Sequence, residues 1–469
     1  MNNQIFEDNY TNFIGPIYGF KRVLADDIML TRDIHKPHPY SIPKNDRVDM
    51  TSIHSYSIDP VGCKDADDAF SVFFENDKLF FAIHIADPTE FIDLSSNLWN
   101  DIVNRTTTKY PSNRAPIHMM PDNVLQLSSL LGNSQGEIKN AITVLTEIDP
   151  VTYGPINEIK LLFSTILVIK YNAFSYQRAS RVCNVIDAFN IGLKISETLK
   201  ANRSLKTKGF KLNELSAAYP VYQDNNHIYL YEDSNEELLM KQMIAEFAIF
   251  ANSFVGEYLK IHLNTGIFRT CKANHWLQTV YNGISGDELL QEIITNGIRA
   301  DYMKSVDSHD LVGMPEYCHF TSPIRRLSDC VCHYLLKYIF FKHKNYYIPF
   351  SDSDLQQLSE RCSTITRIDK KNQYLDIKFR LLQVMKNMIF YDNYIDIQYY
   401  ITGYSGLFLN VIICRINHFR VHMSYTLRVP SYSKNINPKF KYSLSISQIN
   451  CFNQFDTDSI PQLDSHILS

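Results

Sequence analysis

The chain has no excess of charge of one sign and no apolar run long enough to cross a membrane. It carries 46 Lys and Arg against 50 Asp and Glu, so its overall charge does not mark it as a nucleic-acid binder. The longest apolar stretch, at 161–169, is far shorter than the roughly 20 residues of a membrane-spanning helix. The first residues lack the basic start and apolar run of a signal peptide. We therefore expect a soluble, cytoplasmic protein that makes no contact with a membrane.

Disulfides and structural zinc are not expected either. The nine cysteines are an odd number scattered through a long chain, which indicates reduced thiols rather than a disulfide framework. Cys330, Cys332 and His333 are close in sequence, but no second ligand pair follows at the spacing of a zinc finger. The composition likewise gives no reason to expect a small-molecule cofactor.

What the chain does have is enough apolar sequence for a large folded body. Hydrophobic residues make up 45% and aromatic residues 13% of the 469 positions. This length predicts roughly two to four domains. A proline-rich segment at 36–43 closes an N-terminal arm, residues 1–46, that is too short for a complete β-barrel. We place the main body at residues 47–390 and a C-terminal domain at residues 391–469.

Hydrophobic periodicity predicts an α+β fold. Strands are expected at 69–74 and 78–85, joined by a turn at 75–77. Apolar residues that recur every three or four positions predict helices at 236–262, 323–341 and 354–388. The pattern then returns to strands, at 394–402 and 407–415, with Gly403 and Gly406 marking a turn or bulge. The C-terminal domain is therefore expected to be small and β-rich, with an oligonucleotide-binding barrel as one candidate.

The most informative feature is a cluster of four aspartates within ten positions: Asp59, Asp65, Asp67 and Asp68. Their mutual repulsion needs a local counter-charge, and carboxylate oxygens suit the hard cations Mg²⁺ and Mn²⁺. A strand would turn Asp68 away from Asp65 and Asp67, and a helix would bring only Asp68 to Asp65. The four converge only in an irregular loop, which Pro60 and Gly62 make feasible.

Two simpler interpretations of this loop fit less well. An EF-hand calcium loop that starts at Asp65 needs glycine at its sixth position and glutamate at its twelfth, where the chain has Phe70 and Asn76. A solvated acidic turn conflicts with the buried strands expected on either side. Two cations roughly 3.5 to 4 Å apart between bridging carboxylates suit hydrolysis of a nucleic-acid phosphodiester.

A second constellation lies at residues 317–329. Ser322 is predicted to cap a helix that starts at Pro323, which places Arg325 and Arg326 in its first turn. The helix dipole disfavours cations there, so the arginines need an anionic partner. Phosphate is one candidate, because backbone amides and guanidinium groups bind it together. An ion pair with Asp329 is the alternative.

Taken together, these motifs resemble the ribonuclease II and ribonuclease R family of exoribonucleases. Residues 57–60 and 64–69 resemble the family's metal-site signature, and residues 82–88 resemble the strand that follows it. Residues 319–326, with Asp329, resemble its arginine motif. The resemblance covers residues 47–390 and implies an RNB-type catalytic domain whose narrow channel for single-stranded RNA ends at a buried metal site. Residues 403–408 are faintly similar to an S1 barrel.

The resemblance implies a role for each matched residue. The four aspartates would hold two Mg²⁺ ions, with Mn²⁺ as a substitute, and Asp67 is expected to be the least replaceable. Arg325 would stabilise charge on the scissile phosphate, and Arg326 would contact RNA beside it. Tyr110 would stack on a base near the 3′ end, unless it is a core tyrosine.

Sugar recognition is where the chain departs from the family pattern. Tyr176 resembles the tyrosine that senses ribose, whose 2′-hydroxyl separates RNA from DNA. The family has paired glutamates on the helix matching 246–252, whereas this chain has Ala245 before Glu246. Either discrimination against DNA is relaxed, or Glu246 takes over.

The resemblance thus implies a Mg²⁺-dependent hydrolytic 3′-to-5′ exoribonuclease that acts as a monomer on single-stranded RNA and releases nucleoside 5′-monophosphates. The arm of 46 residues cannot hold the cold-shock barrels that the family commonly carries. A non-catalytic RNA-binding relative and a single-strand deoxyribonuclease are the two alternatives. The presence of all four aspartates and Arg325 argues against the first.

Overall fold

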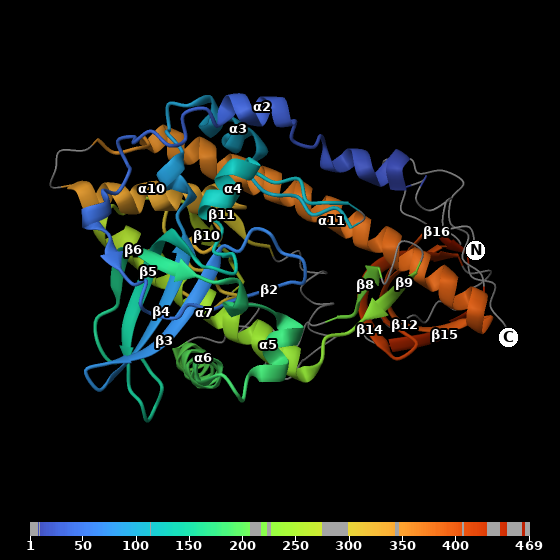
Figure 1. Cartoon of the computed structure of the whole chain (residues 1–469). Helices are drawn as coiled ribbons and strands as arrows, with labels where there is room; N and C mark the ends of the chain where they lie inside the picture. The colour runs from blue at the N-terminus through green and yellow to red at the C-terminus, as the bar shows by residue number, and fades with distance from the viewer. Residues whose placement is uncertain are drawn as a thin grey trace.

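The structure is a computed structural model (Figure 1). It describes Asp8 and residues 10–112, 114–206, 217–222, 227–273, 299–342, 347–405, 408–428, 441–447 and 462–464. A large α/β body and a smaller β-rich part lie at opposite ends of one long helix, α11 (Asp352–Asp392). The α+β class expected from periodicity is confirmed.

A five-stranded sheet in the order β1-β6-β5-β4-β3 forms the centre of the large body. Its strands are β1 (Val48–Asp49), β3 (Asp68–Glu75), β4 (Lys78–Ala86), β5 (Glu137–Ile148) and β6 (Lys160–Val168). Every pair is antiparallel except β1 with β6. The expected hairpin is confirmed as β3 and β4. Its turn places Asn76 and Asp77 at φ of 50° and 61°, a left-handed conformation that these residue types tolerate.

Shorter elements complete the described chain. The helical ones are η1 (Tyr10–Ile14), η2 (Gly15–Tyr18), α2 (Leu24–Leu30), η3 (Lys44–Asp46), η4 (Pro88–Phe91), α3 (Asn97–Arg105), α4 (Asp122–Ser128), η5 (Lys170–Asn172), α5 (Tyr176–Val182) and α6 (Asp187–Lys206). Three two-stranded sheets pair β2 (Ser57–Asp59) with β7 (Ala173–Ser175), β8 (Tyr219–Tyr222) with β9 (Ile228–Tyr231), and β10 (Phe268–Thr270) with β11 (Asp301–Met303).

The three long helices expected from apolar periodicity are present as α7 (Asn235–His262), α10 (Leu327–Phe341) and α11. α7 and α11 each begin at a serine capping box, which satisfies backbone N–H groups of the first turn. α10 begins at Leu327 rather than at Pro323, so the expected cap at Ser322 is wrong. The carboxylate of Asp329 accepts the Ser322 backbone N–H at 2.8 Å, which folds the preceding residues into a turn outside the helix.

Within the described residues, α7 alone has the length and apolar composition of a membrane span. Half of its apolar window is buried inside the protein. The Phe247 ring packs on Phe70 and Phe81 of the central sheet, with ring centroids 5.3 and 4.6 Å apart. Core packing accounts for these apolar residues, so the helix is weak support for a membrane span.

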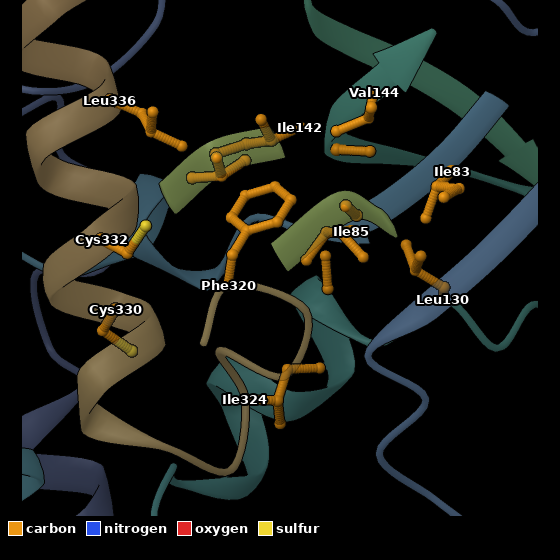
Figure 2. Close-up of a cluster of buried hydrophobic side chains, with 14 of the residues drawn as sticks. Ile83, Ile85, Leu130, Ile142, Val144, Phe320, Ile324, Cys330, Cys332 and Leu336 are labelled. Atoms are coloured by element: carbon orange, nitrogen blue, oxygen red, sulfur yellow. The ribbon is translucent and has the colours of Figure 1, made fainter. Parts of the chain in front are cut away.

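The segment that precedes α10 is held by the core. Figure 2 shows Phe320 between Cys332 and Leu336 of α10 and Ile142 of the sheet, with Ile324 at the base of the same cluster. Phe320 and Ile324 are both fully buried. Because these two side chains are enclosed, the backbone of the intervening turn, and with it Arg325, has one position relative to the sheet.

The C-terminal part is a second five-stranded sheet, in the order β15-β12-β13-β14-β16. Its strands are β12 (Ile395–Ser405), β13 (Phe408–Ile416), β14 (Phe419–Arg428), β15 (Lys441–Ile446) and β16 (Gln462–Asp464). The expected bulge at Gly403 is confirmed by a register shift between Ile401 and Gly403, while Gly406 lies outside the described residues. Five strands is the number of an oligonucleotide-binding barrel. This sheet shares a core with the last turns of α11.

The N-terminal arm packs along α11. The hydroxyls of Tyr10 and Tyr18 both donate to Asp376 Oδ2, at 3.0 and 2.7 Å. Further along the arm, Arg22 donates to Asp101 at 2.7 Å and to the Met119 carbonyl at 2.8 Å. The arm is therefore part of the folded body.

Candidate active site

The acidic loop joins β2 to β3 and is irregular, as expected. Its first turn closes with a hydrogen bond from Cys63 N–H to the Pro60 carbonyl at 3.1 Å, and Gly62 adopts a φ of 81° there. Further on, Leu130 N–H donates to the Ala66 carbonyl at 2.9 Å and Ala86 N–H to the Asp67 carbonyl at 2.8 Å. Residues 65–67 of the loop are buried although residues 60–62 are exposed, so the acidic part is not a solvated turn.

Asp59 and Asp68 interact electrostatically, and neither carboxylate forms an ion pair within the described residues. β2 pairs in parallel with β7, and this register sets Asp59 opposite Ser175, directly before α5. The Oδ2 atom of Asp59 is buried and has no hydrogen-bond partner. Burial first, and then the charge of Asp68, raise the pKa of Asp59 to about 7. Burial also raises the pKa of Asp68 to about 6, although Arg325 and Arg326 oppose it.

Asp65 is held by two residues of the segment that follows α3. The Tyr110 hydroxyl donates to Asp65 Oδ2 at 3.0 Å, and His118 Nδ1 lies 3.5 Å from the same oxygen. Burial acts to raise the pKa of Asp65, but the nearby His118 and the Tyr110 hydroxyl outweigh it and hold that pKa below its usual value. Asp65 is therefore oriented and ionised before any ligand binds.

Asp67 connects the acidic loop to the arginine segment, residues 320–326, which precedes α10. Its Oδ1 accepts the Ile324 backbone N–H and its Oδ2 accepts Arg325 Nε, both at 2.8 Å. Burial raises the pKa of Asp67 to about 8, although Arg325 and the Ile324 amide lower it. The Arg325 side chain is 42% exposed, so part of it is open to a ligand.

The two arginines have different partners. Arg326 donates to Asp329 Oδ1 at 2.8 Å, which is the ion pair considered as the alternative to phosphate. Arg325 pairs instead with Asp67 and also donates to Ser322 Oγ at 2.9 Å. Neither arginine lies in the first turn of α10, since the helix begins at Leu327.

A cavity of about 1260 Å³ connects these groups. Its walls come from the acidic loop, the arginine segment, α7 and the arm. Of the residues expected in the site, it is lined by Asp59, Asp65, Asp67, Asp68, Tyr110, Tyr176, Arg325 and Arg326. Tyr110 is 40% exposed, so it is not a core tyrosine.

Glu246 is the expected site residue that the structure places elsewhere. Its carboxylate is 2% exposed and accepts the Arg203 guanidinium, with NH2 and Oε1 2.5 Å apart. Ala245 lines the cavity in its place, beside Ala248 one turn further along α7. The expectation that Glu246 contacts RNA does not fit this position. Consecutive residues on a helix point in different directions, so Ala245 points into the cavity and Glu246 does not.

The donor set fits a hard divalent cation. In the chain that the structure describes, no three His, Cys, Asp or Glu side chains are already gathered as a metal-binding group. The buried Oδ2 of Asp59, however, lacks a hydrogen-bond partner, and the Asp59 carboxylate interacts electrostatically with that of Asp68. Asp59 and Asp68 are the ligands free for a cation, whereas Asp67 would first have to release Arg325.

His118 was missed by sequence reasoning. It lies beside Asp65 and lines the cavity, but a lone histidine on an irregular segment carries no periodicity or spacing that marks it. Only the fold of the segment between α3 and α4, paired with itself at Lys109 and Ile117, brings it to Asp65.

The architecture is that of the ribonuclease R structures. Mycoplasma genitalium RNase R in complex with ribose methylated single-stranded RNA has a TM-score of 0.71 at 16% identity, over 96% of this chain and 77% of that one. Yeast Ssd1, a pseudonuclease, has a TM-score of 0.65 at 17% identity, over 91% of this chain and 56% of that one. At these identities the likeness establishes the fold alone.

The chain belongs to the RNB domain family, whose profile matches residues 47–342. It is 24% identical over 375 residues to ribonuclease R from Helicobacter pylori (strain J99), which is 71% of this chain and 55% of that protein. It is 22% identical over 350 residues to ribonuclease II, chloroplastic/mitochondrial, from Arabidopsis thaliana, which is 72% of this chain and 42% of that protein. The chain spans about half the length of these relatives. The resemblance inferred from the motifs is confirmed.

Proposed function

We propose that the protein is a Mg²⁺-dependent, hydrolytic 3′-to-5′ exoribonuclease that degrades single-stranded RNA to nucleoside 5′-monophosphates. The observation that carries this proposal is the meeting of four aspartates and Arg325 at the inner wall of one cavity. Direction and product rest on the family. A monomer in the cytoplasm remains the expectation.

Each residue has a defined task in this proposal. Bound divalent cations would supply the charge that activates a water and stabilises the leaving oxygen. Asp59 and Asp68 supply carboxylate oxygens for them, and the Tyr110 hydroxyl keeps Asp65 oriented. Arg325 supplies the counter-charge of Asp67 in the free protein. Its partial exposure then lets the guanidinium turn to the scissile phosphate.

The test is a nuclease assay with full-length protein on oligoribonucleotides labelled at the 5′ or the 3′ end. With Mg²⁺, 3′-labelled RNA should release its label as a mononucleotide at once, while 5′-labelled RNA shortens progressively. With EDTA both should remain intact. Full-length RNA in the presence of Mg²⁺ and Mn²⁺, with a folded sample, would instead support a non-catalytic RNA-binding protein. The likeness to a pseudonuclease makes that the second candidate.

The cavity wall beside Tyr176 predicts weak discrimination between RNA and DNA. Ala245 presents only a methyl group there and cannot accept a hydrogen bond from a 2′-hydroxyl. Ala245→Glu should raise the ratio of RNA to DNA turnover roughly 10- to 100-fold, as expected for one hydrogen bond to a charged acceptor. The measurement is kcat/KM on matched single-stranded RNA and DNA.

The matched control is Ala248→Glu, which adds the same charge to the same wall one helical turn away. It should slow both substrates alike, because a uniform electrostatic repulsion of phosphate does not depend on the sugar. Equal ratios for the two variants would contradict a sugar-sensing position at residue 245.

A further inference from the structure

Three residues of the arm, 19–21, lie between two side chains, Tyr18 and Arg22, that are buried and hydrogen-bonded to the body. On one side Tyr18 is 1% exposed and donates to Asp376 on α11 at 2.7 Å. On the other side the Arg22 guanidinium is tied to Asp101 and the Met119 carbonyl. Gly19 turns the chain between them with a φ of 76°, a conformation that favours glycine. The backbone of Phe20 and Lys21 is therefore held in place without being covered.

This short segment lies at the rim of the catalytic cavity. Lys21 and Leu24 line the cavity and are exposed, whereas Asp65 and Asp67, which also line it, are buried. A lining residue that is also exposed marks the opening. The arm thus forms part of the rim, and the acidic loop forms the inner wall.

Phe20, the chain neighbour of the lining residue Lys21, is 94% exposed, the highest exposure among the large apolar residues described. Its whole ring is therefore available to stack on a ligand. The adjacent Lys21 adds a positive charge. Among the described residues, no ion pair involves this side chain. A flat apolar ring next to a cation, beside a cavity that ends in carboxylates, matches the alternating bases and phosphates of a single strand.

We propose that Phe20 and Lys21 form an entry site for single-stranded RNA, in which Phe20 stacks on a base outside the cavity and Lys21 contacts its phosphate. This inference rests on the proposed function. With the 3′ end at the aspartates, the base on Phe20 belongs to the upstream part of the strand. The arm then contributes an RNA contact, because its two anchors, Tyr18 and Arg22, already hold the backbone of Phe20 in place.

The test measures binding of fluorescein-labelled oligoadenylates by anisotropy, in an Asp67→Asn background that prevents cleavage. Phe20→Ala should weaken binding of a 20-nucleotide strand roughly 5- to 150-fold, the range for loss of one base–aromatic stack. The loss on a tetranucleotide, which is too short to reach from the inner wall past the rim, should be smaller. Phe20→Trp should restore binding. Lys21→Gln should lower the salt dependence by about 0.7 in log K against log salt, the value for one phosphate on a single strand.

The matched control is Phe74→Ala, since Phe74 is 65% exposed on β3 and neither it nor its chain neighbours line the cavity. If Phe20→Ala and Phe74→Ala bind the 20-nucleotide strand equally well, the entry site is wrong while the proposed function stands. If the Asp67→Asn protein binds no RNA at all, the proposed function itself fails. If Phe20→Ala changes the sedimentation of the protein but not RNA binding, the ring covers a second copy of the chain, and the entry site is again overturned.

Discussion

Asp67→Asn is expected to reduce Mg²⁺-dependent release of mononucleotides roughly 10³-fold or more, while RNA binding stays within a few-fold of the wild type. Asparagine keeps the acceptor for the Ile324 amide but loses the charge that pairs with Arg325 and that a cation needs. The inner wall of the cavity would then carry a net positive change, which does not oppose phosphate binding. The measurements are single-turnover rates with saturating Mg²⁺ and the Kd for a 20-nucleotide RNA.

The control for this prediction is Asp77→Asn. It makes the same chemical change in the exposed turn between β3 and β4, where the φ of 61° suits asparagine. It should leave the rate unchanged. If Asp67→Asn retained more than a tenth of the wild-type rate while folded, Asp67 would not belong to the catalytic centre.

Arg325→Ala is expected to lower the single-turnover rate by roughly 10²- to 10³-fold, about 2.7–4 kcal/mol of transition-state stabilisation. The Arg325 side chain is partly exposed and contacts Asp67, and in the proposed mechanism its guanidinium binds the reacting phosphate. Arg325→Lys keeps the charge but loses the planar fork, so its rate should fall between those of the wild type and the alanine variant. Rates are compared at saturating RNA, so that a loss of affinity does not contribute.

A merely structural role for Arg325 would give a different result. In that case Arg325→Ala would lower the thermal midpoint, because Asp67 would be left buried without its partner, and the rate per folded molecule would be unchanged. Thermal unfolding of both variants, measured beside the rates, separates the two outcomes. The arginine at position 326 is a useful comparison, since its ion pair with Asp329 holds the turn before α10.

Much of the architecture follows from local sequence patterns. The β3–β4 hairpin follows from two apolar runs with Asn76 and Asp77 between them, and α7 and α11 follow from long apolar periodicity that begins at a serine. These features depend on interactions of the backbone and of residues close in sequence, so they can be predicted from the sequence alone. The start of α10 does not follow in this way. Ser322-Pro323 is a favourable local helix start. In the fold, however, the Ser322 amide donates to Asp329, and Phe320 and Ile324 are buried in the core.

The amino-acid sequence by itself determined the chemistry that this protein has available: four aspartates in an irregular loop, two adjacent arginines, and the membership of a family that their order indicates. Only the tertiary structure decided which charged side chains pair with each other. Arg325 pairs with Asp67 although Asp329 is closer in sequence, Glu246 turns to Arg203 and leaves Ala245 in the cavity, and His118 reaches Asp65. Groups of equal charge are interchangeable in a sequence pattern. Burial makes an unpaired charge costly, so the packed fold selects one partner for each group among several that the sequence allows.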